Sequence, residues 1–118
     1  MIRLAFLKLP VRDLKRAVNF YEAVFDMELD YVAEEYGWAL LEGDQLSLAL
    51  YVPGKGGGNR EPGGSVEFQL LHPDVAALHA VLHQEFPGSK AGLHDHDDGA
   101  RSLEFTDPEG NEVKILEG

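Results

Sequence analysis

The fold is decided by residues 11–29, which read VRDLKRAVNFYEAVFDMEL. Asp13 stands where a helix N-cap is expected, because its carboxylate can accept a hydrogen bond from a free backbone N–H of the first turn. From Leu14 to Phe25 apolar residues recur at helical spacing, while charged residues occupy the opposite side. This pattern predicts an amphipathic helix of about three turns whose apolar stripe packs on a sheet.

Short apolar segments surround this helix on both sides. Residues 2–11 come before it and predict a strand that ends near Pro10. Turn residues separate three further strand-like runs after the helix, at 29–34, 38–42 and 46–52. The first part of the chain therefore predicts a β-α-β-β-β module over residues 1–52.

A glycine-rich segment follows this module. Residues 53–64, PGKGGGNREPGG, contain six glycines and two prolines. Such a composition favours a flexible chain over a packed one. We therefore expect a linker here.

The order of elements repeats after the linker. A strand is predicted at 65–72, a helix at 75–86, and strands at 90–93, 100–106 and 112–117. A shift of 61 residues superimposes Asp13 on Asp74 and Phe25 on Phe86, which indicates an internal duplication. We expect one α+β domain over residues 1–118, made of two β-α-β-β-β modules whose curved mixed sheets surround a cavity. The second module covers residues 65–118.

Composition restricts the class of protein. A chain of 118 residues suits one domain, and the lack of cysteine excludes disulfides and thiolate metal sites and fits a reducing cytoplasm. The net charge of −11 argues against binding to nucleic acid or to an anionic membrane surface. No apolar run approaches the roughly 18–20 residues of a spanning helix. We expect a cytoplasmic protein that contacts neither nucleic acid nor membrane.

Three segments carry a family resemblance. Residues 11–29, together with LSLALYVP (46–53) and LEFTDPEGNEVKILE (103–117), resemble the vicinal oxygen chelate superfamily. This superfamily includes glyoxalase I, extradiol dioxygenases, fosfomycin resistance enzymes and bleomycin resistance proteins. The resemblance spans nearly the whole chain and implies the glyoxalase/bleomycin resistance fold. It specifies the fold and leaves the chemistry open.

The resemblance also implies where a metal would bind. Metal-dependent members place one ligand on the first strand and one on the last strand of each module, and those positions are Phe6, Leu48, Glu67 and Lys114 here. Phenylalanine and leucine have no donor atoms, and a lysine ammonium repels a cation. Because only Glu67 could serve as a ligand, we expect no metal cofactor. The chain then resembles the metal-free branch typified by bleomycin resistance proteins.

The preferred interpretation is a protein that binds and sequesters an unidentified small molecule in a largely apolar pocket, as a homodimer. If Glu67 and Lys114 both point inward, they could form an ion pair where a metal sits in other members; the simpler interpretation is that one or both face solvent or lie at a dimer edge. No catalytic residue is assigned, and catalysis is left open. The candidate pocket residues are strand side chains of aromatic, aliphatic or charged character: Phe6, Trp38, Leu48, Tyr51, Glu67, Arg101, Phe105 and Lys114.

Two other functions stay open. A metal-dependent lyase, isomerase or dioxygenase of the same superfamily would recruit Glu67, His94 and His96, the latter two from the HDHDD cluster at 94–98. The simpler interpretation of that cluster is a polar loop before a strand. Alternatively, the chain is a regulatory module whose sheet surface binds a partner protein.

Overall fold

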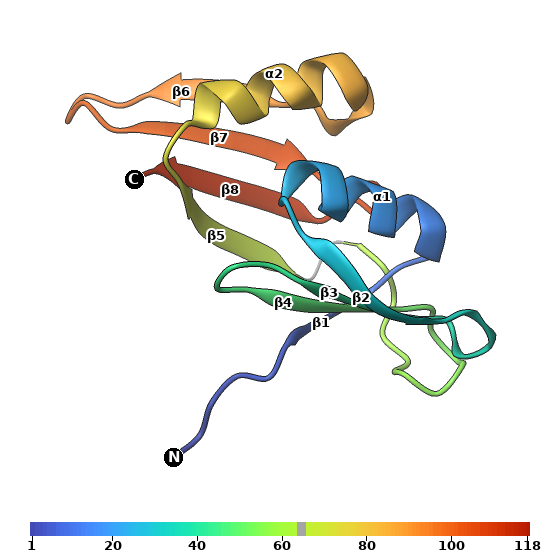
Figure 1. Cartoon of the computed structure of the whole chain (residues 1–118). Coiled ribbons are helices and arrows are strands. Elements are labelled where there is room, and N and C mark those ends of the chain that lie inside the picture. Colours follow the sequence, from blue (N-terminus) through green and yellow to red (C-terminus); the bar gives the residue numbers. More distant parts are fainter. Residues whose placement is uncertain (64–65) are drawn as a thin grey trace. The chain divides into compact units, whose positions relative to one another are not determined.

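The protein is described here by a computed structural model that covers residues 1–63 and 66–118 and divides into two units, 1–63 and 64–118 (Figure 1). Each unit contains one strand, one α-helix and three further strands, so the expected α+β class with two β-α-β-β-β modules is confirmed. Residues 64 and 65, where the predicted linker ends and the second module begins, lie outside the described residues.

The first unit is a four-stranded mixed sheet with one helix. Its strands are β1 (Leu7–Pro10), β2 (Glu28–Ala33), β3 (Trp38–Glu42) and β4 (Ser47–Tyr51), in the order β1-β4-β3-β2. Only the β1–β4 pair is parallel. Helix α1 (Leu14–Val24) begins at Asp13, whose carboxylate accepts a hydrogen bond from the Arg16 N–H at 3.0 Å. A short 3-10 turn, η1 (Glu34–Tyr36), joins β2 to β3.

Helix α1 covers one face of this sheet. The fully buried sheet residues on that face are Leu9, Ala39, Leu41, Leu48 and Leu50, which lie opposite one another in the strand register. The helix buries Ala17, Phe20, Tyr21 and Val24. The apolar stripe predicted for residues 14–25 therefore forms the core of the first unit.

The second unit repeats the arrangement. Its strands are β5 (Glu67–His72), β6 (Gly92–Asp95), β7 (Arg101–Thr106) and β8 (Glu112–Glu117), in the order β5-β8-β7-β6, with only β5 and β8 parallel. Helix α2 (Val75–Glu85) begins at Asp74, whose carboxylate accepts from the Ala77 N–H at 3.0 Å. A 3-10 turn, η2 (Pro87–Ser89), follows the helix. Both helices have 11 residues, and their bounds differ by the predicted shift of 61.

Helix α2 packs on the sheet of its own unit, above β6 and β7 in Figure 1. It buries Val75, Leu78 and Leu82, and the sheet contributes Phe68, Leu103, Phe105, Val113 and Ile115 to the core. The turn between β7 and β8 is held by Asp107. Its carboxylate accepts hydrogen bonds from two backbone N–H groups, those of Glu109 and Asn111, and from the Asn111 side chain, all at 2.8–2.9 Å.

Two strands differ from their predicted bounds. Strand β1 begins at Leu7 rather than at residue 2, because the ladder with β4 begins with Leu7 opposite Leu48. Strand β6 covers 92–95 rather than 90–93, since Lys90 has a left-handed backbone (φ +56°) after η2. His94 and Asp95 therefore belong to a strand and not to a loop.

The glycine-rich segment packs where we expected a free linker. A Cβ atom on Gly57 would lie 2.9 Å from Cε3 of Trp38, and one on Gly58 would lie 2.6 Å from Cε2 of Tyr51. Backbone at this distance from two aromatic rings requires glycine. The segment up to residue 63 accordingly belongs to the first unit.

Neither α-helix of the described residues has the length and apolar character that crossing a bilayer requires.

Candidate functional site

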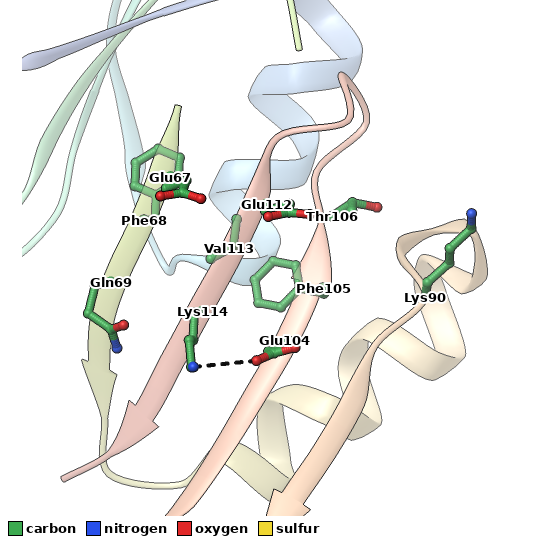
Figure 2. A pocket seen from close by; sticks show the side chains of 10 residues that line it. All are labelled: Glu67, Phe68, Gln69, Lys90, Glu104, Phe105, Thr106, Glu112, Val113 and Lys114. Carbon is green, nitrogen blue, oxygen red and sulfur yellow. Dashed lines mark ion pairs between the residues drawn. The ribbon is translucent and has the colours of Figure 1, made fainter. Parts of the chain in front are cut away.

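The sheet of the second unit has a polar face opposite α2. Alternation along the strands places Glu67, Gln69, Glu104, Thr106, Glu112 and Lys114 on this face. We call these six residues the polar face. They line a shallow cavity of about 610 Å³, within the size range of small-molecule sites (Figure 2).

Lys114 lies at the centre of the polar face. It belongs to β8, and the register places Gln69 of β5 on one side of it and Glu104 of β7 on the other. Its Nζ atom is 3.5 Å from Oε1 of Glu104, as Figure 2 shows. The other oxygen of Glu104, Oε2, is 3.8 Å from Nε2 of His94. Glu104 therefore lies between two nitrogen-bearing side chains.

Glu67 and Lys114 do not form the ion pair considered for the case in which both point inward. The parallel register places Glu67 opposite Glu112, one row away from Lys114, and the partner of Lys114 is Glu104. A shift of two residues along a strand moves a side chain by about 7 Å, which is enough to exchange one carboxylate partner for another. Both residues nevertheless line the same cavity.

Arg101 and Phe105 do not belong to the polar face. They alternate with Ser102, Glu104 and Thr106 along β7 and therefore point to the α2 side of the sheet. Phe105 is 4% exposed and belongs to the core, but it also lines the cavity of the polar face, as expected for this candidate residue. Arg101 lies at the end of the β6–β7 hairpin, where its Nε atom is 2.8 Å from Oδ1 of Asp95. That hydrogen bond, more than any other cause, raises the pKa of Arg101.

The candidate residues of the first unit separate into two groups. Leu48 is fully buried against α1, so its expected position in a ligand pocket is wrong. Trp38 and Tyr51 lie opposite each other on the other face of the sheet, and Phe6 makes an edge-to-face contact with Trp38 at 5.8 Å. Lys8, which the sequence did not single out, holds its Nζ atom 5.8 Å from the Trp38 ring centre and 5.2 Å from that of Tyr51.

The sequence analysis also missed Gln69 and Glu104. The sequence of the β7–β8 hairpin could have predicted the role of Glu104. The Asp107–Asn111 turn places Thr106 opposite Glu112 and hence Glu104 opposite Lys114. Gln69 had no such signal, since the parallel register of β5 and β8 depends on how two strands far apart in sequence meet.

The donor set does not fit a metal ion. Glu67 and His94 lie on β5 and β6, the two edges of the sheet, and three strand spacings separate them by about 14 Å. His96 is engaged elsewhere, with Nε2 2.8 Å from Oγ of Ser102. Within residues 1–63 and 66–118, no three His, Asp or Glu side chains gather in a group that could hold a metal.

Comparisons with known proteins agree with this architecture. A model of the Glyoxalase/Bleomycin resistance protein/Dioxygenase superfamily matches residues 3–115. No curated protein matches the sequence.

Solved structures share the fold at low sequence identity. Lactoylglutathione lyase from Agrobacterium tumefaciens has a TM-score of 0.73 and 20% identity, covering 100% of this chain and 96% of that one. The fosfomycin resistance protein FosX from Mesorhizobium loti has a TM-score of 0.74 and 18% identity, covering 100% and 94%. A transposon-encoded bleomycin resistance determinant has a TM-score of 0.70 and 18% identity, covering 99% and 98%. At these identities the likeness concerns the fold alone.

Proposed function

The chain belongs to the glyoxalase/bleomycin resistance protein/dioxygenase superfamily, and from this membership we propose that it binds and sequesters a small molecule without a resident metal. The structural neighbours include both resistance proteins and a lyase, so the choice between binding and catalysis depends on the site residues of this chain.

The observation that carries the proposal is the position of Lys114. By resemblance, a metal ligand stands there in metal-dependent members, whereas here an ammonium group lies 3.5 Å from Glu104. A second cation beside this ammonium would be repelled. The lysine instead offers hydrogen-bond donors to a ligand, Glu104 offers acceptors, and the Gln69 amide offers both. These groups suit the polar head group of a small molecule.

The second unit supplies the polar part of this proposal. Phe6 and Trp38 of the first unit, both half-buried, remain proposed ligand contacts of the apolar kind, whereas Tyr51 is only 3% exposed because Gly58 packs against its ring. Aromatic rings bind the apolar parts of a ligand at low entropic cost, because few rotatable bonds are immobilised.

The first test is metal content. Untagged protein is incubated with Ni²⁺, Zn²⁺, Mn²⁺ or Fe²⁺, desalted and analysed by elemental mass spectrometry. We expect no stoichiometric metal. Retention of one equivalent that is lost in Glu67→Gln would contradict the proposal and favour the metal-dependent enzyme.

The second test is ligand binding by isothermal titration calorimetry. The names of the neighbours supply the probes bleomycin, fosfomycin and S-lactoylglutathione, each titrated without metal. For a probe that binds, Lys114→Gln should weaken affinity about tenfold, the loss expected for one hydrogen bond to a charged group. Arg60→Gln removes an exposed cation of the first unit and is the control. If Lys114→Gln bound the probe as tightly as Arg60→Gln, Lys114 would not contact the ligand.

We also propose that the chain forms a homodimer in the cytoplasm. In support, members of this superfamily often build their pocket across paired chains. Light scattering after gel filtration measures the mass in solution. A monomer at micromolar concentration would contradict the dimer.

A further inference from the structure

A groove lies on the helix side of the first unit, between α1 and the edge strand β2, on the opposite face of the sheet from the Trp38 side chain. Its volume is about 370 Å³, and its lining includes Val18 of α1, Leu29 and Val32 of β2, and Val52 after β4. Leu29 and Val32 are 40% and 43% exposed, although they point to the same side of the sheet as the core. Helix α1 thus leaves the apolar side of β2 partly uncovered.

A β-bulge creates this groove. Leu29 lies opposite Leu41 and Tyr31 lies opposite Leu40, so Asp30 is an extra residue in β2. Without the bulge, residues 29 and 32 would point to opposite faces, because their separation is an odd number. With it, both Leu29 and Val32 face the helix side. Bulges often re-aim side chains in this way next to binding sites.

A glycine belongs to the lining of the groove. Gly37 has a left-handed backbone (φ +57°), and a Cβ atom there would lie 2.8 Å from Cβ of Val52 and 3.2 Å from Cδ of Lys55. Only glycine allows Val52 and the aliphatic part of Lys55 to approach this closely. This close approach brings Val52 and Lys55 into the lining of the groove beside Gly37.

Two lysines stand at the rim of the groove. Lys15 of α1 and Lys55 line it, and neither ammonium has an ion-pair partner within the described residues. Glu34 is the acidic residue of the lining. Lys15 lies in the first turn of α1, where the helix dipole disfavours a cation, so helix stability does not account for it. In a protein of net charge −11, this rim is locally basic.

We propose that this groove is a second binding site, which takes a small molecule with an apolar body and one anionic group, such as a medium-chain carboxylate. The apolar body packs against Val18, Leu29 and Val32, and the anion lies between Lys15 and Lys55. The volume is at the lower end of the range for small-molecule sites, which suits a ligand of this size. The site is independent of the polar face of the second unit.

Octanoate is the probe for this site. It is titrated into ¹⁵N-labelled full-length protein, and amide shifts are followed by NMR, with octylamine as the probe of opposite charge. We expect octanoate to shift the amides of Val18, Leu29 and Val32, with octylamine binding at least tenfold more weakly. The double variant Lys15→Glu/Lys55→Glu should weaken octanoate binding about tenfold, from the loss of two exposed charge contacts.

Two controls separate the charge from the fold. The double variant Arg3→Glu/Arg60→Glu makes the same change of charge at two exposed positions outside the groove and should bind octanoate with unchanged affinity. Val32→Asp places a carboxylate in the apolar lining at a position that is 43% exposed and should abolish the shifts, and circular dichroism checks that the variant is folded.

Three outcomes would overturn the proposal. Equal affinity for octanoate and octylamine would show that the anionic group does not contribute to binding. Shifts confined to residues outside the groove would show that octanoate binds elsewhere. Shifts of Leu29 and Val32 that depend on protein concentration alone would assign the groove to a contact between copies of the chain.

Discussion

The two units share a backbone plan and differ in the side chains on the sheet face opposite the helix. Both helices begin at a capping aspartate and have 11 residues, and both sheets place a parallel pair at one edge. The first unit has an aromatic face with Lys8, against which Gly57 and Gly58 pack, and the second has a charged face around Lys114. Strand β2 carries a bulge, whereas the register of β6 is regular.

This difference indicates that different residues determine folding and binding. At the centre of each sheet the helix-facing residues are apolar and buried, because the core constrains them. The opposite faces and the edge strands carry no such constraint, and they are where the two units diverge. In a duplicated fold, the residues that differ between the copies are therefore the first place to look for a ligand.

One substitution in each core tests whether the two cores contribute equally to stability. Leu50 lies opposite Leu9, and Ile115 lies opposite Leu70, so the two residues occupy corresponding positions. Leu50→Ala and Ile115→Ala should each lower the free energy of unfolding by about 2–5 kcal/mol, because each leaves a cavity. Urea denaturation measures both, with the exposed Leu71→Ala as a control near zero. If only one of the two variants had a lower free energy of unfolding, the two cores would not contribute equally to stability.

A substitution at Gly57 tests whether the glycine-rich segment covers the aromatic face of the first unit. Its Cβ would meet both Trp38 and Tyr51 at 2.9 Å, so Gly57→Ala should cost about 1–3 kcal/mol or displace the segment. Trp38 is the single tryptophan, and its fluorescence should shift to longer wavelength as its ring becomes exposed. Gly88→Ala in the second unit has no atom within 4 Å and serves as the control. An unchanged spectrum would mean that the segment does not cover Trp38 in solution.

The common helix start can be tested at its capping residues. Asp13→Ala and Asp74→Ala each remove a side-chain acceptor for a backbone N–H, which should cost about 1 kcal/mol. Thermal or urea unfolding measures the loss, and the Asn variants at the same positions should retain most of the stability. If either alanine variant were as stable as the parent, that aspartate would not cap its helix.

The smallest effect on stability is expected at the polar face. Lys114→Gln and Glu104→Gln break an ion pair whose side chains are about half exposed, so each should change the free energy of unfolding by less than about 1 kcal/mol. Ligand binding should fall in both variants while stability is maintained. A large loss of stability would instead make the pair a structural element of the sheet.

Much of the fold could be predicted from local patterns. The caps at Asp13 and Asp74, the periodicity that follows them and the shift of 61 residues determined the helices and the duplication, and all were confirmed. The lack of donor atoms at Phe6 was also visible in the sequence. These features depend on neighbouring residues in the chain, which is why one sequence is enough to find them.

The candidate site depended on the tertiary structure. The partner of Lys114, the burial of Leu48 and the direction of Arg101 all follow from strand register, as does the groove made by the bulge at Asp30. Side chains alternate along a strand with a period of two, so a slip of one residue moves a side chain to the other face. The sequence by itself determined which segments form strands and helices. Only the meeting of distant strands decided which side chains share a surface, because register is set by packing between segments far apart in the chain.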